Sequence, residues 1–382
     1  MKTMERILRL MAERKASDVY LSGHAPALMR INGVCVPVNG QMLPPEAPRN
    51  LLAEIVPRAR IEELEHTGEL NMAIPIEGVG NFRISAMRQR GSYAVVVRYI
   101  AARIPSLEEL HLPEILKTLV MERRGLLLMV GATGAGKSST LASMLDYRNA
   151  NVSGHILTVE EPIEFTFVNK KSMVNQRAVG SDTESLEVAL KNALRQAPDV
   201  IQIGEIRDRK TMSAAITYAQ SGHLCLATLH ANNAYRALNR ILGFYPVEAR
   251  PALLGDLAAS LRAVVAQRLL RTRDGGRLPA LEVLLNTTLI SALIEKGDFS
   301  GVREAMMQSM AEGSQCFEDD IERLILNNQV DRDEGLAQSD SPTNLLWRLQ
   351  NKSKPSAPVD SRPPPVETDE ASFTDMVLDV RF

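Results

Sequence analysis

The 382-residue sequence is poor in cysteine and in aromatic side chains, and it carries almost no net charge. Its three cysteines, Cys35, Cys225 and Cys316, stand far apart, so neither a disulfide framework nor a cysteine zinc site is expected. The formal net charge is −2, and no stretch interleaves basic with aromatic residues. A nucleic-acid partner is therefore disfavoured, and a reducing cytoplasm suits the cysteine usage.

Long apolar runs are also missing. None reaches about 18 residues, the length that a transmembrane helix needs, so no transmembrane segment is expected. The opening stretch MKTMERILRLMAERKASD places charges among its apolar positions and lacks the apolar centre of a signal peptide. A cytoplasmic location follows as the expectation.

The first 100 residues predict a small α+β domain. Apolar residues recur at helical spacing over 4–11, and residues 27–38 alternate around Asn32-Gly33, which predicts a hairpin. Residues 71–100 read as three further strands separated by glycine-containing turns. The proline-containing segment 101–112 has little periodicity and is predicted to be a linker.

Residues 113–350 have the alternating pattern of an α/β domain with mostly parallel, buried strands. The strand-like runs are GLLLMV (125–130), HILTV (155–159), VIQI (200–203) and LCLAT (224–228). An apolar helix face lies between them, at residues 186–194. Residues 351–382 are rich in proline, serine and charge, and are predicted to form a disordered tail.

A phosphate-binding loop is the strongest motif. In GLLLMVGATGAGKSST a strand, a glycine-rich turn and a helix start satisfy G-x-x-x-x-G-K-[ST]. Lys137 is expected to reach the β- and γ-phosphates of ATP, and the Ser138 hydroxyl to bind Mg²⁺. The loop residues expected to contact the nucleotide are Gly131, Ala132, Thr133, Gly134, Ala135, Gly136, Lys137, Ser138 and Ser139.

Acidic residues follow two other strand-like runs. Glu205 comes after VIQI and a glycine. A phosphate-binding loop needs such an acid on a neighbouring strand to help bind the metal. Glu160, Glu161 and Glu164 crowd into EEPIEF, directly after HILTV. We expect that strand to lie near the loop's strand, so that its acids hold Mg²⁺ and the attacking water. His230, just past LCLAT, could sense the γ-phosphate.

Four elements occur in one order: GATGAGKSS, TVEEPIEF, APDVIQIGEIRD and SGHLCLATLHANN. Together they resemble the Walker A, Asp box, Walker B and His box of the secretion-superfamily ATPases. The match is nearest to the type IV pilus retraction ATPases of the PilT/PilU family, and RQAPD and DYRN resemble the PilU group. The first 100 residues resemble that family's PAS-like domain. Residues 261–270 and 293–325 resemble its C-terminal helical region.

The resemblance implies a RecA-like ATPase that works as a hexameric ring. It implies that Glu164 polarises the attacking water, that Glu205 orients Mg²⁺ through water, and that Glu160 and Glu161 support the site. It further implies that His230 and His223 couple nucleotide state to the ring. The N-terminal arginines that would reach the nucleotide are Arg83, Arg98 or the nearby Arg103. Glu161 departs from the aspartate usual in this motif.

Retraction of a type IV pilus is the function that the resemblance implies, through an inner-membrane platform protein and with a PilT-type ATPase as a possible pair. The chain would then lie at the cytoplasmic base of the pilus machine. An assembly or type II secretion ATPase is the first alternative, although the longer N-terminal region and four-cysteine zinc insert common in those relatives are not seen. An ATP-binding regulator of a paired motor is the second.

Overall fold

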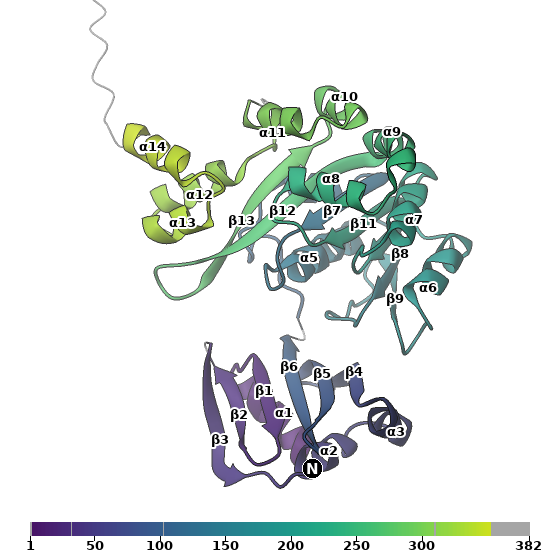
Figure 1. Ribbon diagram of the computed structural model, residues 1–382, viewed down its shortest axis with the longest axis vertical. Coiled ribbons are helices and arrows are strands. Elements are labelled where there is room, and N and C mark those ends of the chain that lie inside the picture. Colours follow the sequence, from purple (N-terminus) through teal and green to yellow (C-terminus); the bar gives the residue numbers. More distant parts are fainter. Residues whose placement is uncertain (1, 32, 102, 309–310, 353–382) are drawn as a thin grey trace, which may run out of the picture.

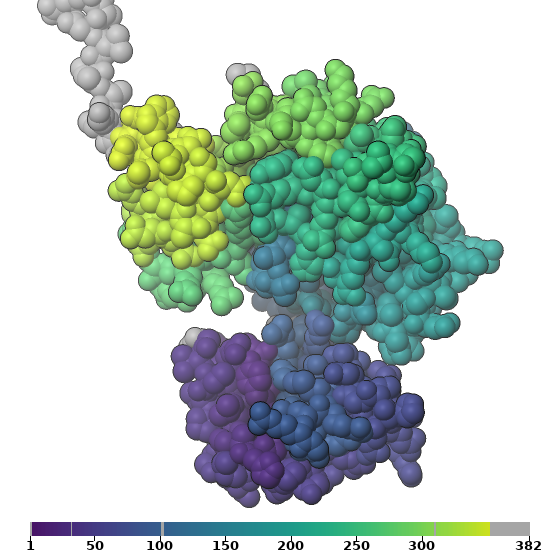
Figure 2. Space-filling view, viewed as in Figure 1, coloured from purple at the N-terminus to yellow at the C-terminus, as the bar shows by residue number. Residues whose placement is uncertain are grey.

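The computed structural model describes residues 2–31, 33–101, 103–308 and 311–352, which form a smaller N-terminal and a larger C-terminal domain (Figure 1). In the space-filling view the N-terminal domain is a separate lobe that meets the larger domain over a narrow region (Figure 2). Of the predicted tail, all but its first two residues lies outside the described chain. Among the described residues, no helix combines the length and apolar character needed to cross a bilayer.

The N-terminal domain is an antiparallel sheet with helices packed on it. Its strand order is β3-β2-β1-β6-β5-β4. The strands are β1 (Asp18–Ser22), β2 (Pro26–Ile31), β3 (Val34–Met42), β4 (Glu69–Ile76), β5 (Gly80–Gln89) and β6 (Ser92–Ala101), and the helices are α1 (Thr3–Glu13), α2 (Ala47–Ala53) and α3 (Arg58–Thr67).

The local predictions for this domain are confirmed. The amphipathic helix buries Met4, Leu8 and Met11 in the domain core. The hairpin joins β2 to β3 through the pair Ile31–Val34, with Gly33 at a positive φ of 84°. Asn32 lies outside the described residues.

The C-terminal domain is built on a sheet of order β13-β12-β7-β11-β10-β8-β9, parallel except for β13. Its strands are β7 (Gly125–Val130), β8 (Gly154–Glu160), β9 (Ser172–Ala178), β10 (Val200–Ile203), β11 (Leu224–Leu229), β12 (Leu261–Arg271) and β13 (Arg277–Leu285). The four apolar runs named above are β7, β8, β10 and β11, and the α/β fold class is confirmed.

Helices cover both faces of this sheet. Helix α4 (Ile115–Val120) precedes β7, and the helices that follow strands of this sheet are α5 (Lys137–Asn151), α6 (Leu186–Ala193), α7 (Arg209–Gln220), α8 (Ala234–Gly243) and α9 (Arg250–Ser260). The C-terminal helices are α10 (Thr288–Lys296), α11 (Phe299–Met307), α12 (Phe317–Leu326), α13 (Arg332–Gln338) and α14 (Pro342–Lys352).

Two expectations about this domain are wrong. Residues 261–270 do not belong to a helical region, because β12 inserts them into the sheet between β7 and β13. In addition, β10, which carries Glu205 at its end, is not a neighbour of the phosphate-loop strand β7, since β11 lies between them; β8 lies next to β10. All these strands are parallel, so their carboxyl ends still meet at one edge of the sheet.

The segment 101–112, expected to be a linker, is anchored at its far end. Leu107 and Leu112 are buried in a core shared with β7 and α5. The carbonyl of Pro105 accepts a hydrogen bond from the Ser143 hydroxyl of α5 at 2.7 Å. From Pro105 onward, the segment is therefore held against the larger domain.

Candidate nucleotide site

The phosphate-binding loop lies between β7, which is buried throughout, and α5, which begins at Lys137. The Lys137 ammonium donates hydrogen bonds to the carbonyls of Gly131 and Ala132, each at 2.9 Å. Lys137 as a whole is only 9% exposed to solvent. Burial lowers the pKa of Lys137, against the attraction of Glu205 and Glu164. A buried cation that donates hydrogen bonds to two loop carbonyls is well placed to bind an anionic ligand.

Two glycines of the loop are required by close approach to β12. A Cβ on Gly131 would lie 2.6 Å from the Gln267 carbonyl, and one on Gly136 would lie 2.7 Å from Gln267 Nε2. The Gln267 amide donates to the Ala135 carbonyl at 2.8 Å and accepts from the Thr140 hydroxyl at 2.8 Å. Gln267 thus holds the loop from a neighbouring strand, a role that the sequence reasoning missed.

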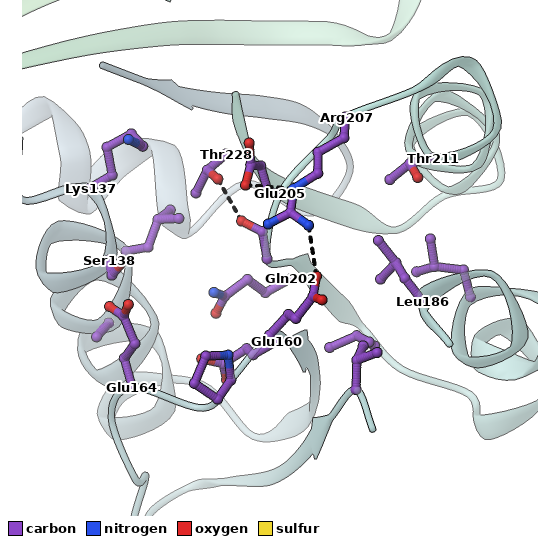
Figure 3. A pocket seen from close by; sticks show the side chains of 18 of the residues that line it. Lys137, Ser138, Glu160, Glu164, Leu186, Gln202, Glu205, Arg207, Thr211 and Thr228 are labelled. Carbon is purple, nitrogen blue, oxygen red and sulfur yellow. Dashed lines mark hydrogen bonds and ion pairs between the residues drawn. The ribbon is translucent and has the colours of Figure 1, made fainter. Parts of the chain in front are cut away.

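A cavity of about 1180 Å³ opens beside this loop, between the two domains. It lies at the carboxyl ends of the parallel strands, where open α/β sheets bind ligands. Figure 3 shows Lys137, Ser138, Glu164 and Glu205 around this cavity. Its lining includes the expected residues Lys137, Ser138, Glu160, Glu161, Glu164, Glu205, His230, Arg83 and Arg98.

Glu160 has uncharged partners. Its Oε1 accepts hydrogen bonds from the Thr158 hydroxyl at 2.6 Å and from the Gln176 amide at 3.2 Å. Desolvation raises the pKa of this carboxyl, although the two hydrogen bonds oppose the change. Because these bonds join the end of β8 to β9, Glu160 stabilises the wall of the cavity through uncharged partners.

Glu161 and Glu205 share one arginine. The Arg207 guanidinium donates from Nε to Glu205 Oε2 at 2.9 Å (Figure 3). It also donates from NH1 to Glu161 Oε2, again at 2.9 Å. His230 Nε2 lies 3.1 Å from the other Glu205 oxygen, Oε1. The sequence predicted a site containing Glu161, Glu205 and His230, but assigned no role to Arg207. Its position two residues after Glu205 was the available signal.

Glu164 faces the N-terminal domain. Its Oε1 lies 3.8 Å from NH1 of Arg83, which is on β5. Two residues before Arg83 on β5, the Asn81 side-chain amide donates a hydrogen bond of 2.8 Å to the hydroxyl of Thr166. This bond joins β5 to the loop that contains Glu164. Arg98 lines the cavity from β6 and forms an ion pair of 2.9 Å with the buried Asp18.

Two of the weaker candidates lie elsewhere. Arg103 forms an ion pair with Glu109 at 2.6 Å and is not among the residues that line the cavity. His223 precedes β11, at the amino end of the strand, and its Nδ1 lies 3.1 Å from the Ser221 hydroxyl. It is therefore at the opposite edge of the sheet from the site.

The chemistry of the donors suits Mg²⁺ brought in with a nucleotide. Ser138 and Glu205 both line the cavity and offer hydroxyl and carboxylate oxygen, the hard ligands that Mg²⁺ prefers. Within the described ranges, no group of three or more histidine, cysteine, aspartate or glutamate side chains could hold a metal alone. Such a site requires phosphate oxygens to complete the coordination of the ion.

A parallel sheet, a glycine-rich loop that leads into a helix, and acids at the same sheet edge define a P-loop nucleotide hydrolase. The model of the type II/IV secretion system protein family matches residues 1–299. The chain belongs to this family, and it is an ATPase of the PilT/PilU type.

Two relatives from Pseudomonas aeruginosa cover nearly the whole chain. It is 45% identical to the type IV pilus ATPase PilU over 92% of this chain and 93% of PilU. It is 34% identical to the type IV pilus retraction ATPase PilT over 89% of this chain and 98% of PilT. The crystal structure of the pilus retraction motor PilT with bound ADP superposes with a TM-score of 0.83 at 35% identity, over 91% of this chain and 99% of that one.

Proposed function

We propose that this chain is a Mg²⁺-dependent, homo-hexameric motor that couples ATP hydrolysis to the retraction of a type IV pilus. The observation that carries the proposal is the cavity that combines the phosphate loop, Glu164 and Glu205 with an arginine of the second domain. A site shared by two domains can convert a change of nucleotide into a change of domain orientation. The similarity to PilU and PilT supports a type IV pilus as the structure on which the motor acts.

In this proposal each side chain has a separate task. Lys137 and the amides of its loop would bind the phosphates, while Ser138 and Glu205 would hold Mg²⁺, which would supply positive charge against the phosphates. Glu164 orients the attacking water and withdraws its proton. Arg83, which lies 3.8 Å from Glu164, can move to the γ-phosphate as the domains close.

The proposed partners follow from the same relatives. The ring would act on an inner-membrane platform protein at the cytoplasmic base of the pilus, and would work beside a PilT-type ATPase. Similarity to both PilU and PilT supports a chain that functions within such a pair. This arrangement also admits the alternative of an ATP-binding regulator, whose own turnover would be negligible.

The test is the ATPase rate of the purified chain, measured alone and with a PilT-type ATPase, with Lys137→Ala as the matched variant. The wild type should hydrolyse ATP. Lys137→Ala should abolish turnover and weaken nucleotide binding, because the variant lacks the ammonium that would contact the β- and γ-phosphates. Near-normal turnover of Lys137→Ala would refute the assignment of the loop. Turnover that arises only from the partner would favour the regulator.

A further inference from the structure

Arg207 joins two carboxylates that come from different strands. Glu161 follows β8 and Glu205 follows β10, and the guanidinium contacts both at 2.9 Å. With His230 at 3.1 Å from Oε1, both oxygens of Glu205 face a basic side chain. We refer to the Glu161–Arg207–Glu205 contacts as the Arg207 bridge.

The bridge occupies the carboxylate that the proposed mechanism assigns to Mg²⁺. While Oε2 accepts the Arg207 hydrogen bond and Oε1 faces His230, Glu205 has fewer lone pairs and less uncompensated negative charge to offer the metal or its waters. A guanidinium and a divalent cation are competitors for the same negative charge. Binding of Mg²⁺ with a nucleotide should therefore displace Arg207 from Glu205.

The exposure of the bridge permits this exchange. The side chains of Arg207 and Glu161 are 59% and 56% exposed, whereas that of Glu205 is 21% exposed. Exposed ion pairs contribute little net free energy, so the Arg207–Glu205 contact can be given up at small cost. Glu161 offers the displaced guanidinium a second partner that is already within hydrogen-bond distance.

We infer that Arg207 is a positioning residue, which holds Glu205 in the nucleotide-free site and is drawn away from it by Glu161 when Mg²⁺ and nucleotide bind. The inference rests on the proposed Mg²⁺–ATP site. It gives Glu161 a task of its own, because the bridge depends on the reach of that carboxylate to NH1. Arg207 weakens the affinity of the site for Mg²⁺, and Glu161 restores part of that affinity through Arg207.

The test is a Mg²⁺ titration of nucleotide binding, with a fluorescent non-hydrolysable ATP analogue as the probe. Arg207→Gln should lower the half-saturating Mg²⁺ concentration by about two- to five-fold, and Glu161→Gln should raise it by a similar factor. In the double variant Arg207→Gln/Glu161→Gln the titration should coincide with that of Arg207→Gln, because Glu161 acts only through Arg207.

A matched control distinguishes the effect of the direct Arg207–Glu205 contact from the effect of removing any positive charge near the cavity. Lys210 lines the same cavity, but its ammonium pairs with Glu187 at 3.0 Å rather than with Glu205. Lys210→Gln removes the same charge and should leave the Mg²⁺ titration near that of the wild type. Melting of each variant without nucleotide reports whether the fold is intact.

Several results would overturn the inference. They are no shift in Arg207→Gln, an equal shift from Glu161→Gln with and without Arg207, or an equal effect of Lys210→Gln. Loss of analogue binding in Arg207→Gln would instead assign Arg207 to the phosphates. If the wild type fails to bind the analogue, or binds it without regard to Mg²⁺, the proposed Mg²⁺–ATP site falls and the inference falls with it.

Discussion

The three glutamates of EEPIEF face three different partners. Glu160 accepts hydrogen bonds from Thr158 and Gln176, Glu161 pairs with Arg207, and Glu164 faces Arg83 of the other domain. Their mutual repulsion is relieved because each carboxylate points to its own donor. Of the three, only Glu164 lies opposite the N-terminal domain, where the γ-phosphate would be enclosed.

Replacement of Glu164 separates binding from hydrolysis. Glu164→Gln should retain ATP binding and lose turnover by about 10²- to 10⁴-fold, since the amide keeps the shape of the side chain but cannot withdraw a proton from water. Binding of the ATP analogue and steady-state phosphate release are the two measurements. Glu161→Gln, at saturating Mg²⁺, is the control that should remain active.

The opposite pattern would contradict this assignment. If Glu161→Gln is inactive while Glu164→Gln hydrolyses ATP, the catalytic carboxylate has moved within the motif. The departure from the usual aspartate at position 161 would then mark a relocated base, and not a partner of Arg207.

Several residues that line the cavity could be named from the sequence because short motifs carry them. Lys137, Ser138, Glu164 and Glu205 stand at fixed offsets from strands that are buried and apolar. The partners that orient these groups were not predictable in the same way. Gln267 meets the loop from a strand more than a hundred residues further along the chain, so only the fold brings the two together.

At the scale of elements, β13 supplies a buried acid to the helix that follows the His230 segment. Glu282 on β13 accepts a hydrogen bond of 2.7 Å from the backbone N–H of Ala234, the first residue of α8. Burial raises the pKa of this carboxyl to about 7, even though the Ala234 hydrogen bond favours the charged form. The neutral acid is therefore the form that this packing stabilises.

A dependence of stability on pH follows from that raised pKa. The contribution of the protonated carboxyl is fully present below its ordinary pKa near 4.5 and is lost as pH rises through about 7. Glu282→Gln removes the titration but keeps an acceptor for Ala234. The variant should gain up to roughly 3 kcal/mol over the wild type at pH 8, and little at low pH.

Thermal melting at pH 5.5 and pH 8 measures this difference. The gap between Glu282→Gln and the wild type should widen at the higher pH. Glu295→Gln, which changes an exposed glutamate of α10, is the matched control and should follow the wild type at both values. Parallel melting profiles for Glu282→Gln and the wild type would show that Glu282 is charged in the folded protein.

Strands were predicted correctly from sequence where every residue of the strand is buried. The prediction failed for β12, where pairing with other strands decides the secondary structure. The runs of β7, β10 and β11 are buried at every position, so their apolar sequences are typical of central parallel strands. The sequence of β12 is rich in leucine, alanine and arginine, which also suit a helix. Its pairing with β7 and β13 makes it a strand, and local sequence does not encode that pairing.

At the scale of the whole molecule, the nucleotide site depends on how the two domains meet. Arg83 and Asn81 of β5 reach the loop after β8 of the same chain, through Glu164 and Thr166. No pattern in the sequence fixes this contact, because it joins segments from separate domains. Family resemblance suggested the arginines, and it left open whether they serve their own nucleotide or a neighbour's.

We expect ATP to be hydrolysed at a site that Arg83 of the same chain closes, because Arg83 lies 3.8 Å from Glu164 of its own chain. Both Arg83→Ala and Lys137→Ala should lower turnover, so the decisive measurement is the ATPase rate of mixed rings that contain the two variants, with subunit exchange confirmed by native mass spectrometry. If Arg83 acts within its own chain, no subunit of the mixed ring has a complete site, and activity should stay at the level of the separate variants. Recovery of activity on mixing would show that Arg83 completes the site of a neighbouring subunit, and would refute closure of the site by Arg83 of the same chain.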